Sequence, residues 1–133
     1  MDYVYTISYR GVVFYVGSSG QPVNRFYYHV SGNNLYTRFR VYEILKKGNF
    51  PKLTIVYHSP DKKEVLKKER ELIKQMYESG ANIVNVRGNK NFVKISKIKS
   101  IDTRIFKQVM KRPGYKKARL YFWKYYESCH SRR

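Results

Sequence analysis

Two short runs of β-branched and aromatic residues stand at the start of this chain, separated by only three residues. The first run is Tyr3–Ser8 and the second is Val12–Val16, with Tyr9-Arg10-Gly11 between them. Such runs favour β-strands, and a connection this short suits a hairpin turn. The fold is therefore expected to begin with an antiparallel hairpin, whose second strand over 12–16 is ended by Gly17-Ser18-Ser19-Gly20.

The rest of the chain carries mainly helical signals. Pro22 stands where a first helical turn begins, and Asp61 with Glu64 forms a capping-box pattern before a long apolar stripe. The expected elements after the hairpin are, in order, a helix over 22–30, a helix over 38–47, a strand over 53–57, a helix from Asp61 to about Glu78, and helices over 102–110 and 115–127.

The charge of the chain indicates its partner. Among 133 residues, 28 Lys and Arg face nine acids, which gives a net charge of +19. An excess of this size is usually neutralised by a polyanion, and nucleic acid is the first candidate. A membrane surface fits poorly, because the chain has no long apolar run and no basic helix with a broad apolar face.

The charge also suggests how the chain is divided. Residues 91–133 contain thirteen Lys and Arg but only two acids. A chain of this length forms one domain, or one domain with an appendage. We therefore expect a core over residues 1–90 and a basic, mostly helical extension over 91–133 that binds nucleic acid.

Cysteine content limits both the chemistry and the compartment. Cys129 is the one cysteine of the sequence, which excludes an internal disulfide and a Cys-cluster zinc site. No targeting segment is recognised at the N-terminus. An intracellular, cytoplasmic protein is expected.

Glu69 is the most informative polar residue of the long helix. The apolar pairs Val65-Leu66, Leu72-Ile73 and Met76-Tyr77 form a stripe that requires an inward residue near position 69, where glutamate stands. A buried carboxylate needs a cation, a metal ion or several donors. The alternative is a glutamate at the stripe's edge that pairs with Lys or Arg.

Other polar residues are ambiguous when each is considered alone. Arg25 and His29 lie four apart and share one helical face, where they suit phosphate binding and proton transfer, or equally a solvated surface. Tyr5 and Tyr15 lie on neighbouring strands and either point into one site or simply pack. Asn85 either orients a site through its amide or stands in a turn.

Together these residues resemble the GIY-YIG nuclease family over about residues 1–88. Tyr3-Val4-Tyr5 corresponds to the first motif, although Tyr3 stands where the family has glycine, and Tyr15-Val16-Gly17 corresponds to the second. Arg25 and His29 follow at the family's spacing, then Glu69 and Asn85. The resemblance implies an α+β fold, with a small, mainly antiparallel three-stranded sheet flanked by helices.

The resemblance also implies a reaction. Tyr5, with help from His29, would take a proton from a water molecule that attacks a DNA phosphodiester, although the sequence does not decide which of the two tyrosines is the base. Arg25 would stabilise the charge that grows on the phosphate, Tyr15 would position the water or phosphate, and Asn85 would orient the site.

One divalent metal ion is implied as well. Mg²⁺, with Mn²⁺ as a substitute, would bind Glu69, phosphate oxygens and water, and would stabilise the leaving 3′ oxygen. No small-molecule cofactor is expected. Cutting both strands would need a homodimer or two binding events, and the small size is compatible with a nuclease of a phage or mobile element.

Two other functions are compatible with the sequence. One is a non-catalytic nucleic-acid-binding protein on a degenerate nuclease scaffold, and the other is a basic RNA-binding or ribosome-associated protein. In the extension, a helix over 115–127 would either enter a groove as a recognition helix or pack on the core and contact phosphates. We favour phosphate contacts by Lys116, Lys117, Arg119 and Lys124.

Overall fold

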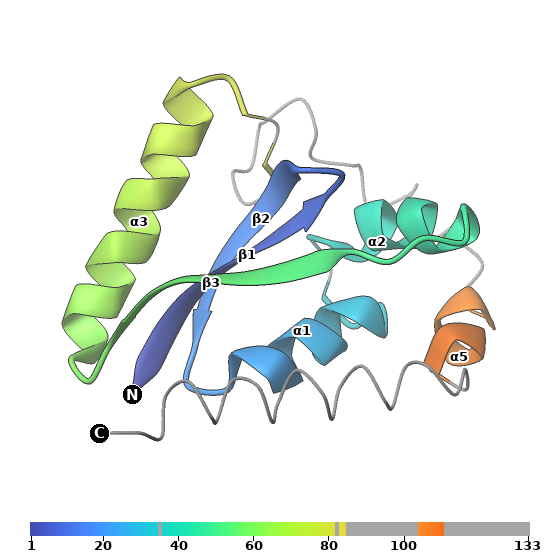
Figure 1. Ribbon diagram of the computed structural model, residues 1–133, viewed down its shortest axis with the longest axis horizontal. Coiled ribbons are helices and arrows are strands. Elements are labelled where there is room, and N and C mark those ends of the chain that lie inside the picture. Colours follow the sequence, from blue (N-terminus) through green and yellow to red (C-terminus); the bar gives the residue numbers. More distant parts are fainter. Residues whose placement is uncertain (35, 82, 85–103, 111–133) are drawn as a thin grey trace.

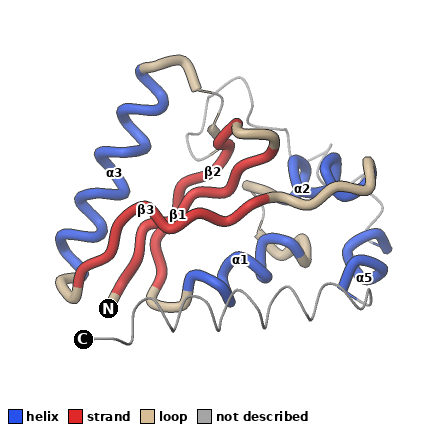
Figure 2. Tube along the Cα trace, viewed as in Figure 1, coloured by secondary structure: helices blue, strands red, loops and turns tan. Residues whose placement is uncertain are grey.

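The computed structural model of the protein describes residues 1–34, 36–81, 83–84 and 104–110. Its centre is a three-stranded antiparallel sheet of β1 (Asp2–Tyr9), β2 (Val12–Ser19) and β3 (Lys52–Ser59). The strand order is β2-β1-β3, so the first strand is central and β2 is an edge strand (Figures 1 and 2). The expected α+β fold with a small antiparallel sheet is confirmed.

The hairpin between β1 and β2 closes through two residues. Arg10 (φ 52°) and Gly11 (φ 78°) both have positive φ, as the tightest hairpin turns require. Further along, the register shifts between Ile7 and Ser8, which face Tyr15 and Val13, so that Phe14 is left without a partner in the ladder. This bulge places Phe14 and Tyr15, two consecutive residues, against the same core cluster.

Helices cover both faces of the sheet. On one face lies α3 (Lys62–Glu78), whose Val65 packs with Val4 and Val16. On the other lie α1 (Pro22–Val30) and α2 (Arg38–Lys46), and Figure 1 shows α1 and α3 on opposite sides of the strands. The larger core is on this second face, and it is formed by Tyr5, Ile7, Phe14, Val23, Phe26, Val30, Val41, Ile44, Leu45, Leu53 and Phe106.

A short helix from the basic third of the chain completes that core. This is α5 (Arg104–Met110), which packs against α2 and buries Phe106 to 3% exposure. The Phe106 ring lies so close to Gly32 that a Cβ there would be 2.7 Å from it, and the positive φ of Gly32 (79°) also suits glycine. The part of the expected 102–110 helix that the structure describes, 104–110, is therefore part of the folded core, whereas the helix expected over 115–127 lies outside the described residues.

Two local expectations are corrected. The second strand continues through Gly17 to Ser19, because Gly17 and Ser18 pair with Tyr5 and Val4 in the ladder. At the start of α3, Asp61 caps the backbone N–H of Lys63. Glu64 does not return to Asp61 as a capping box requires, but accepts a hydrogen bond from Ser59 Oγ. Among the described residues, no helix is long and apolar enough to cross a membrane.

Candidate active site

Tyr5 and Tyr15 are brought together by the pairing of the first two strands. Their ring centroids are 6.2 Å apart, and Tyr5 is 1% exposed. Gly17 lies opposite Tyr5, where a Cβ would be 2.6 Å from Cζ and Oη of Tyr5 and 2.9 Å from Cε2 of Tyr15. The glycine of the second motif is thus needed because the two rings occupy the space of any larger side chain.

His29 joins the two tyrosines from α1. Its ring centroid is 4.7 Å from that of Tyr15, and its Nε2 is 3.1 Å from the Tyr5 hydroxyl. The other ring nitrogen, Nδ1, is 2.7 Å from Oγ1 of Thr37, so both nitrogens have a partner. His29 is fully buried, and this excludes the partly exposed helix histidine that the sequence left open.

Burial controls the protonation of these three side chains. Burial, and secondly the charge of Arg25, lower the pKa of His29 to about 3, so the imidazole is neutral near pH 7. Burial also raises the pKa values of Tyr5 and Tyr15. Arg25 opposes this rise at both hydroxyls through its positive charge, and at Tyr5 also through a hydrogen bond.

Arg25 occupies the exposed side of α1, next to the tyrosines. Its guanidinium lies 4.6 Å from the ring centroid of Tyr28, which restrains the side chain by a cation–π contact. A guanidinium at this position offers fixed donors to an incoming phosphate while it also acts on the Tyr5 hydroxyl.

Glu69 approaches from α3, one turn after Val65. Its carboxylate oxygen Oε2 accepts a 2.6 Å hydrogen bond from Oγ of Ser18 on edge strand β2. Within the described part of the chain no Lys or Arg forms an ion pair with Glu69. Its negative charge is close enough to raise the pKa of Tyr15 and, more weakly, that of Tyr5.

The donor set around Glu69 limits which metal ion it suits. No group of three or more His, Cys, Asp or Glu side chains comes together among residues 1–34, 36–81, 83–84 and 104–110. Zinc prefers three or four protein ligands, which is more than these described residues supply around Glu69. One carboxylate beside a hydroxyl fits Mg²⁺, which takes few protein ligands and fills its octahedron with water and phosphate oxygens.

Five of the six candidate catalytic residues are thus gathered around β2. The sixth, Asn85, lies outside the described residues, as do Lys116, Lys117, Arg119 and Lys124 of the basic extension. The two residues before Asn85, Ile83 and Val84, are buried in the core. The Val84 N–H donates a 2.8 Å hydrogen bond to the Phe14 carbonyl. Phe14, the bulge residue of β2, therefore holds the segment at Val84 against this strand.

Three further residues belong to this site and were not identified from the sequence. Ser18 bonds Glu69, Thr37 bonds His29, and Tyr36 lies close enough to Tyr15 to raise its pKa. Ser18 directly follows Tyr15-Val16-Gly17, and this position next to the second motif is the signal that could have identified it. Nothing local distinguishes Thr37 or Tyr36, because their partners lie on α1 and β2.

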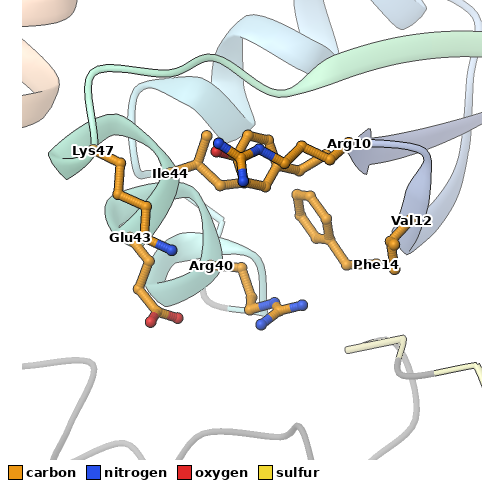
Figure 3. Close-up of a pocket in the computed structure, with 8 residues that line it drawn as sticks. Arg10, Val12, Phe14, Arg40, Glu43, Ile44 and Lys47 are labelled. Atoms are coloured by element: carbon orange, nitrogen blue, oxygen red, sulfur yellow. The ribbon is translucent and has the colours of Figure 1, made fainter.

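A basic pocket adjoins the site. It has a volume of about 270 Å³ and lies between the hairpin turn and α2. Figure 3 shows Arg10 reaching in from the turn and Arg40 from the helix, on either side of Phe14. Lys47 adds a third positive charge against one acid, Glu43. Phe14 precedes Tyr15, and Arg40 is one turn after Thr37, so the pocket shares β2 and α2 with the site.

Comparison with known proteins agrees with this geometry. Residues 1–83 match the model of the GIY-YIG catalytic domain, which covers the sheet, α1, α2, α3 and all the described site residues. Neither the curated proteins nor the solved structures contain a match. The chain therefore belongs to the GIY-YIG family, a nuclease family whose members act on nucleic acid and are generally metal-dependent.

Proposed function

We propose that this protein is a metal-dependent DNA endonuclease that hydrolyses phosphodiester bonds in a single displacement. The observation that carries the proposal is the cluster of Tyr5, Tyr15 and His29 beside Arg25, with Glu69 held across β2 by Ser18. Family membership supports nuclease chemistry in general, and the arrangement of these side chains supports the roles assigned below.

Tyr5 is the proposed general base. As tyrosinate it would take a proton from the attacking water, whose oxygen then forms the new bond to phosphorus. The bond to the 3′ oxygen breaks in the same step, and that oxygen leaves with the electron pair and is protonated from solvent. Because burial raises the pKa of Tyr5, the positive charge of Arg25 and a donor at the phenol oxygen are needed to form the base.

Arg25 is the proposed phosphate ligand. It is exposed on α1, while its charge acts on both tyrosines. A phosphate bound by Arg25 would thus lie next to the Tyr5 hydroxyl, where the attacking water must stand. Tyr15 would hold that water or a phosphate oxygen, and Asn85 would orient the group.

Glu69 is the proposed ligand of a divalent metal ion, Mg²⁺ or Mn²⁺. When bound, the ion would stabilise negative charge on the leaving oxygen. The part played by the chain is to hold Glu69 in place: Ser18 fixes one carboxylate oxygen from a strand on which the catalytic Tyr15 also lies. Ligand orientation by such a neighbour is common at metal sites.

DNA rather than a small phosphodiester is proposed as the substrate. The net charge of +19 and the arginines beside the basic pocket suit a long polyanion. We assign the contacts distant from the site to residues 91–133, with Lys116, Lys117, Arg119 and Lys124 on phosphates.

A plasmid-nicking assay tests the proposal. Supercoiled DNA is incubated with the full-length protein in Mg²⁺, Mn²⁺ or EDTA, and the Glu69→Ala variant is run beside it. Metal-dependent conversion to open circles that is lost in the variant is expected. Salt-sensitive DNA binding without cleavage in any metal, across supercoiled, branched and modified substrates, would indicate the non-catalytic alternative.

A further inference from the structure

A buried chain of three polar side chains links Tyr5, His29 and Thr37. The Tyr5 hydroxyl lies 3.1 Å from Nε2 of His29, and Oγ1 of Thr37 lies 2.7 Å from Nδ1. His29 and Thr37 are both fully buried, and Tyr5 is 1% exposed. Thr37 lies at the start of α2, so these two side-chain hydrogen bonds connect β1, α1 and α2.

The position of Thr37 leaves its hydroxyl available to hydrogen bond with His29. Thr37 is the N-cap residue of α2, where a threonine hydroxyl normally accepts a hydrogen bond from the first turn of the helix. No such bond is made here. Asn34 holds the preceding turn instead, since its Oδ1 accepts from the backbone N–H groups of Tyr36 and Thr37 at 2.9 and 3.2 Å.

The neutral imidazole of His29 carries one proton on either Nδ1 or Nε2, so two hydrogen-bond arrangements are available for Tyr5, His29 and Thr37. If Nδ1 carries it, Nδ1–H donates to Thr37 and Tyr5 donates to Nε2. The hydroxyl hydrogen of Thr37 then has no acceptor, because within the described part of the chain Oγ1 bonds only to His29. A buried donor without a partner costs about 1–3 kcal/mol.

The other arrangement satisfies every donor. Thr37 donates its hydroxyl hydrogen to Nδ1, and His29 donates Nε2–H to the Tyr5 oxygen. The Tyr5 hydroxyl hydrogen is then directed towards Tyr15, whose ring centroid is 6.2 Å away and whose pKa is lowered by a side-chain hydrogen bond from Tyr5. Satisfaction of buried polar groups therefore selects this tautomer.

We propose that Thr37 is a positioning residue that holds His29 as its Nε2–H tautomer, so that His29 donates to the Tyr5 oxygen and stabilises the tyrosinate. This inference rests on the proposed role of Tyr5 as the base. His29 then acts as a fixed donor, because the imidazole keeps its own proton and the proton of the attacking water ends on Tyr5. A nucleophile or base oriented by a partner that is itself oriented by a third group is a general pattern of active sites.

The tautomer is measured directly by ¹⁵N NMR of the histidine ring in the full-length protein. The chain has three histidines, and the signals of His29 are assigned by their loss in His29→Gln. In the wild type and in Thr37→Ser we expect a protonated Nε2 and an unprotonated Nδ1 near pH 7. In the near-isosteric Thr37→Val, which has no hydroxyl, the Nδ1–H form should gain population.

Two results of this measurement would overturn the proposal. One is a wild-type His29 that is protonated at Nδ1, and the other is a Thr37→Val spectrum identical to that of the wild type. The Thr37→Ser variant retains the hydroxyl and separates loss of the hydrogen bond from loss of packing. A folded backbone spectrum is required of each variant before the ring signals are compared.

Cleavage kinetics form the second arm. Thr37→Val should lower kcat by about tenfold to a hundredfold with little change in DNA affinity, as for other residues that orient a catalytic group, and Thr37→Ser should restore most of the rate. A kcat unchanged in Thr37→Val would overturn the role in catalysis. If the wild type cuts no DNA, the proposed function fails, while the NMR result still decides the tautomer.

Discussion

Ser18 donates a 2.6 Å hydrogen bond to Oε2 of Glu69, and this contact joins an edge strand to a helix 51 residues later in the chain. It brings the carboxylate to the strand that carries Tyr15 and Gly17. The two sides of the candidate site thus come from opposite faces of the sheet: Tyr5 packs on the α1 face, while Ser18 pairs with Val4 on the α3 face.

Removal of the Ser18 hydroxyl should weaken metal binding. In Ser18→Ala the carboxylate of Glu69 loses its fixed orientation, and the affinity for Mn²⁺ should fall about tenfold or more. Calorimetric titration with Mn²⁺ measures this in the absence of DNA. Ser19→Ala is the matched control, because Ser19 bonds the backbone of Gln21 rather than Glu69. Equal Mn²⁺ affinities of Ser18→Ala and the wild type would show that this hydrogen bond does not prepare a metal site.

Gly17 should not tolerate a methyl group. A Cβ at 2.6 Å from the Tyr5 ring forces Tyr5 or Tyr15 to move, so Gly17→Ala should destabilise the fold by about 1–3 kcal/mol and remove most of the cleavage activity. Urea unfolding and the nicking rate measure the two effects. Gly20→Ala serves as the control, since the nearest atom to its Cβ is an Asp2 side-chain oxygen at 3.2 Å. Similar behaviour of both variants would contradict the close packing proposed for Gly17.

Burial of His29 should make the fold sensitive to acid. The pKa of His29 is about 3 in the folded protein, against about 6.5 when unfolded, so below pH 6.5 the unfolded chain binds the proton more readily. Stability is therefore lost as the pH falls. Between pH 7 and pH 5, protonation of this one group in the unfolded chain should lower the free energy of unfolding by about 2 kcal/mol.

This effect is tested by urea unfolding of the wild type and of His29→Gln at pH 7 and at pH 5. The variant lacks the titrating ring, so its free energy of unfolding should change less between pH 7 and pH 5 than that of the wild type. Thr37 and Tyr5 remain present in both proteins. An equal loss of stability in both would mean that His29 is readily protonated in the folded state.

The basic extension should supply much of the salt dependence of DNA binding. Each phosphate contact contributes a slope of about 0.9 in a plot of log K against log salt. Substitution of Lys116, Lys117, Arg119 and Lys124 by glutamine in the full-length chain should therefore weaken binding and flatten this slope. Fluorescence anisotropy over a salt series measures both quantities.

A charge-matched control is available on α3. Lys62, Lys63, Lys67 and Lys74 are exposed on this helix, and their substitution removes the same four charges. A slope that changes equally in the two quadruple variants would indicate a general effect of net charge and would refute specific contacts by the extension.

Removal of the whole region 91–133 is not a clean test of that extension. Phe106 is 3% exposed and lies against Gly32 in the main core. Deleting it leaves a cavity that typically costs about 3–5 kcal/mol. Loss of function after this truncation would therefore report unfolding as well as lost DNA contacts, and point substitutions are preferable.

The sequence was sufficient to predict most of the fold. Hydrophobic spacing, with the helix-start signals at Pro22 and Asp61, predicted the three strands and the helices of the core within a few residues of their observed ends. It did not predict the bulge at Phe14 or the extension of β2 to Ser19, because both depend on how β2 pairs with β1. Glu64 was misassigned for a similar reason, since Ser59 competes for its carboxylate.

The candidate site was less accessible to prediction. The spacing of Glu69 within an apolar stripe indicated an inward carboxylate, but its partner Ser18 is 51 residues away. His29 appeared equally suited to a solvated surface, and its burial follows from the packing of α1 on the sheet. Thr37 carried no local signal, because its hydroxyl bonds a histidine on another helix rather than its own helix terminus.

The most direct test of the account compares two glutamates on the same helix. Glu69 faces Ser18, whereas Glu71 is exposed, and Glu→Gln removes one negative charge without a change in shape at either position. We predict that Glu69→Gln abolishes Mg²⁺-dependent cleavage of plasmid DNA while DNA affinity is retained, and that Glu71→Gln cleaves at the wild-type rate. Equal cleavage by Glu69→Gln and Glu71→Gln would contradict a catalytic site built around Glu69.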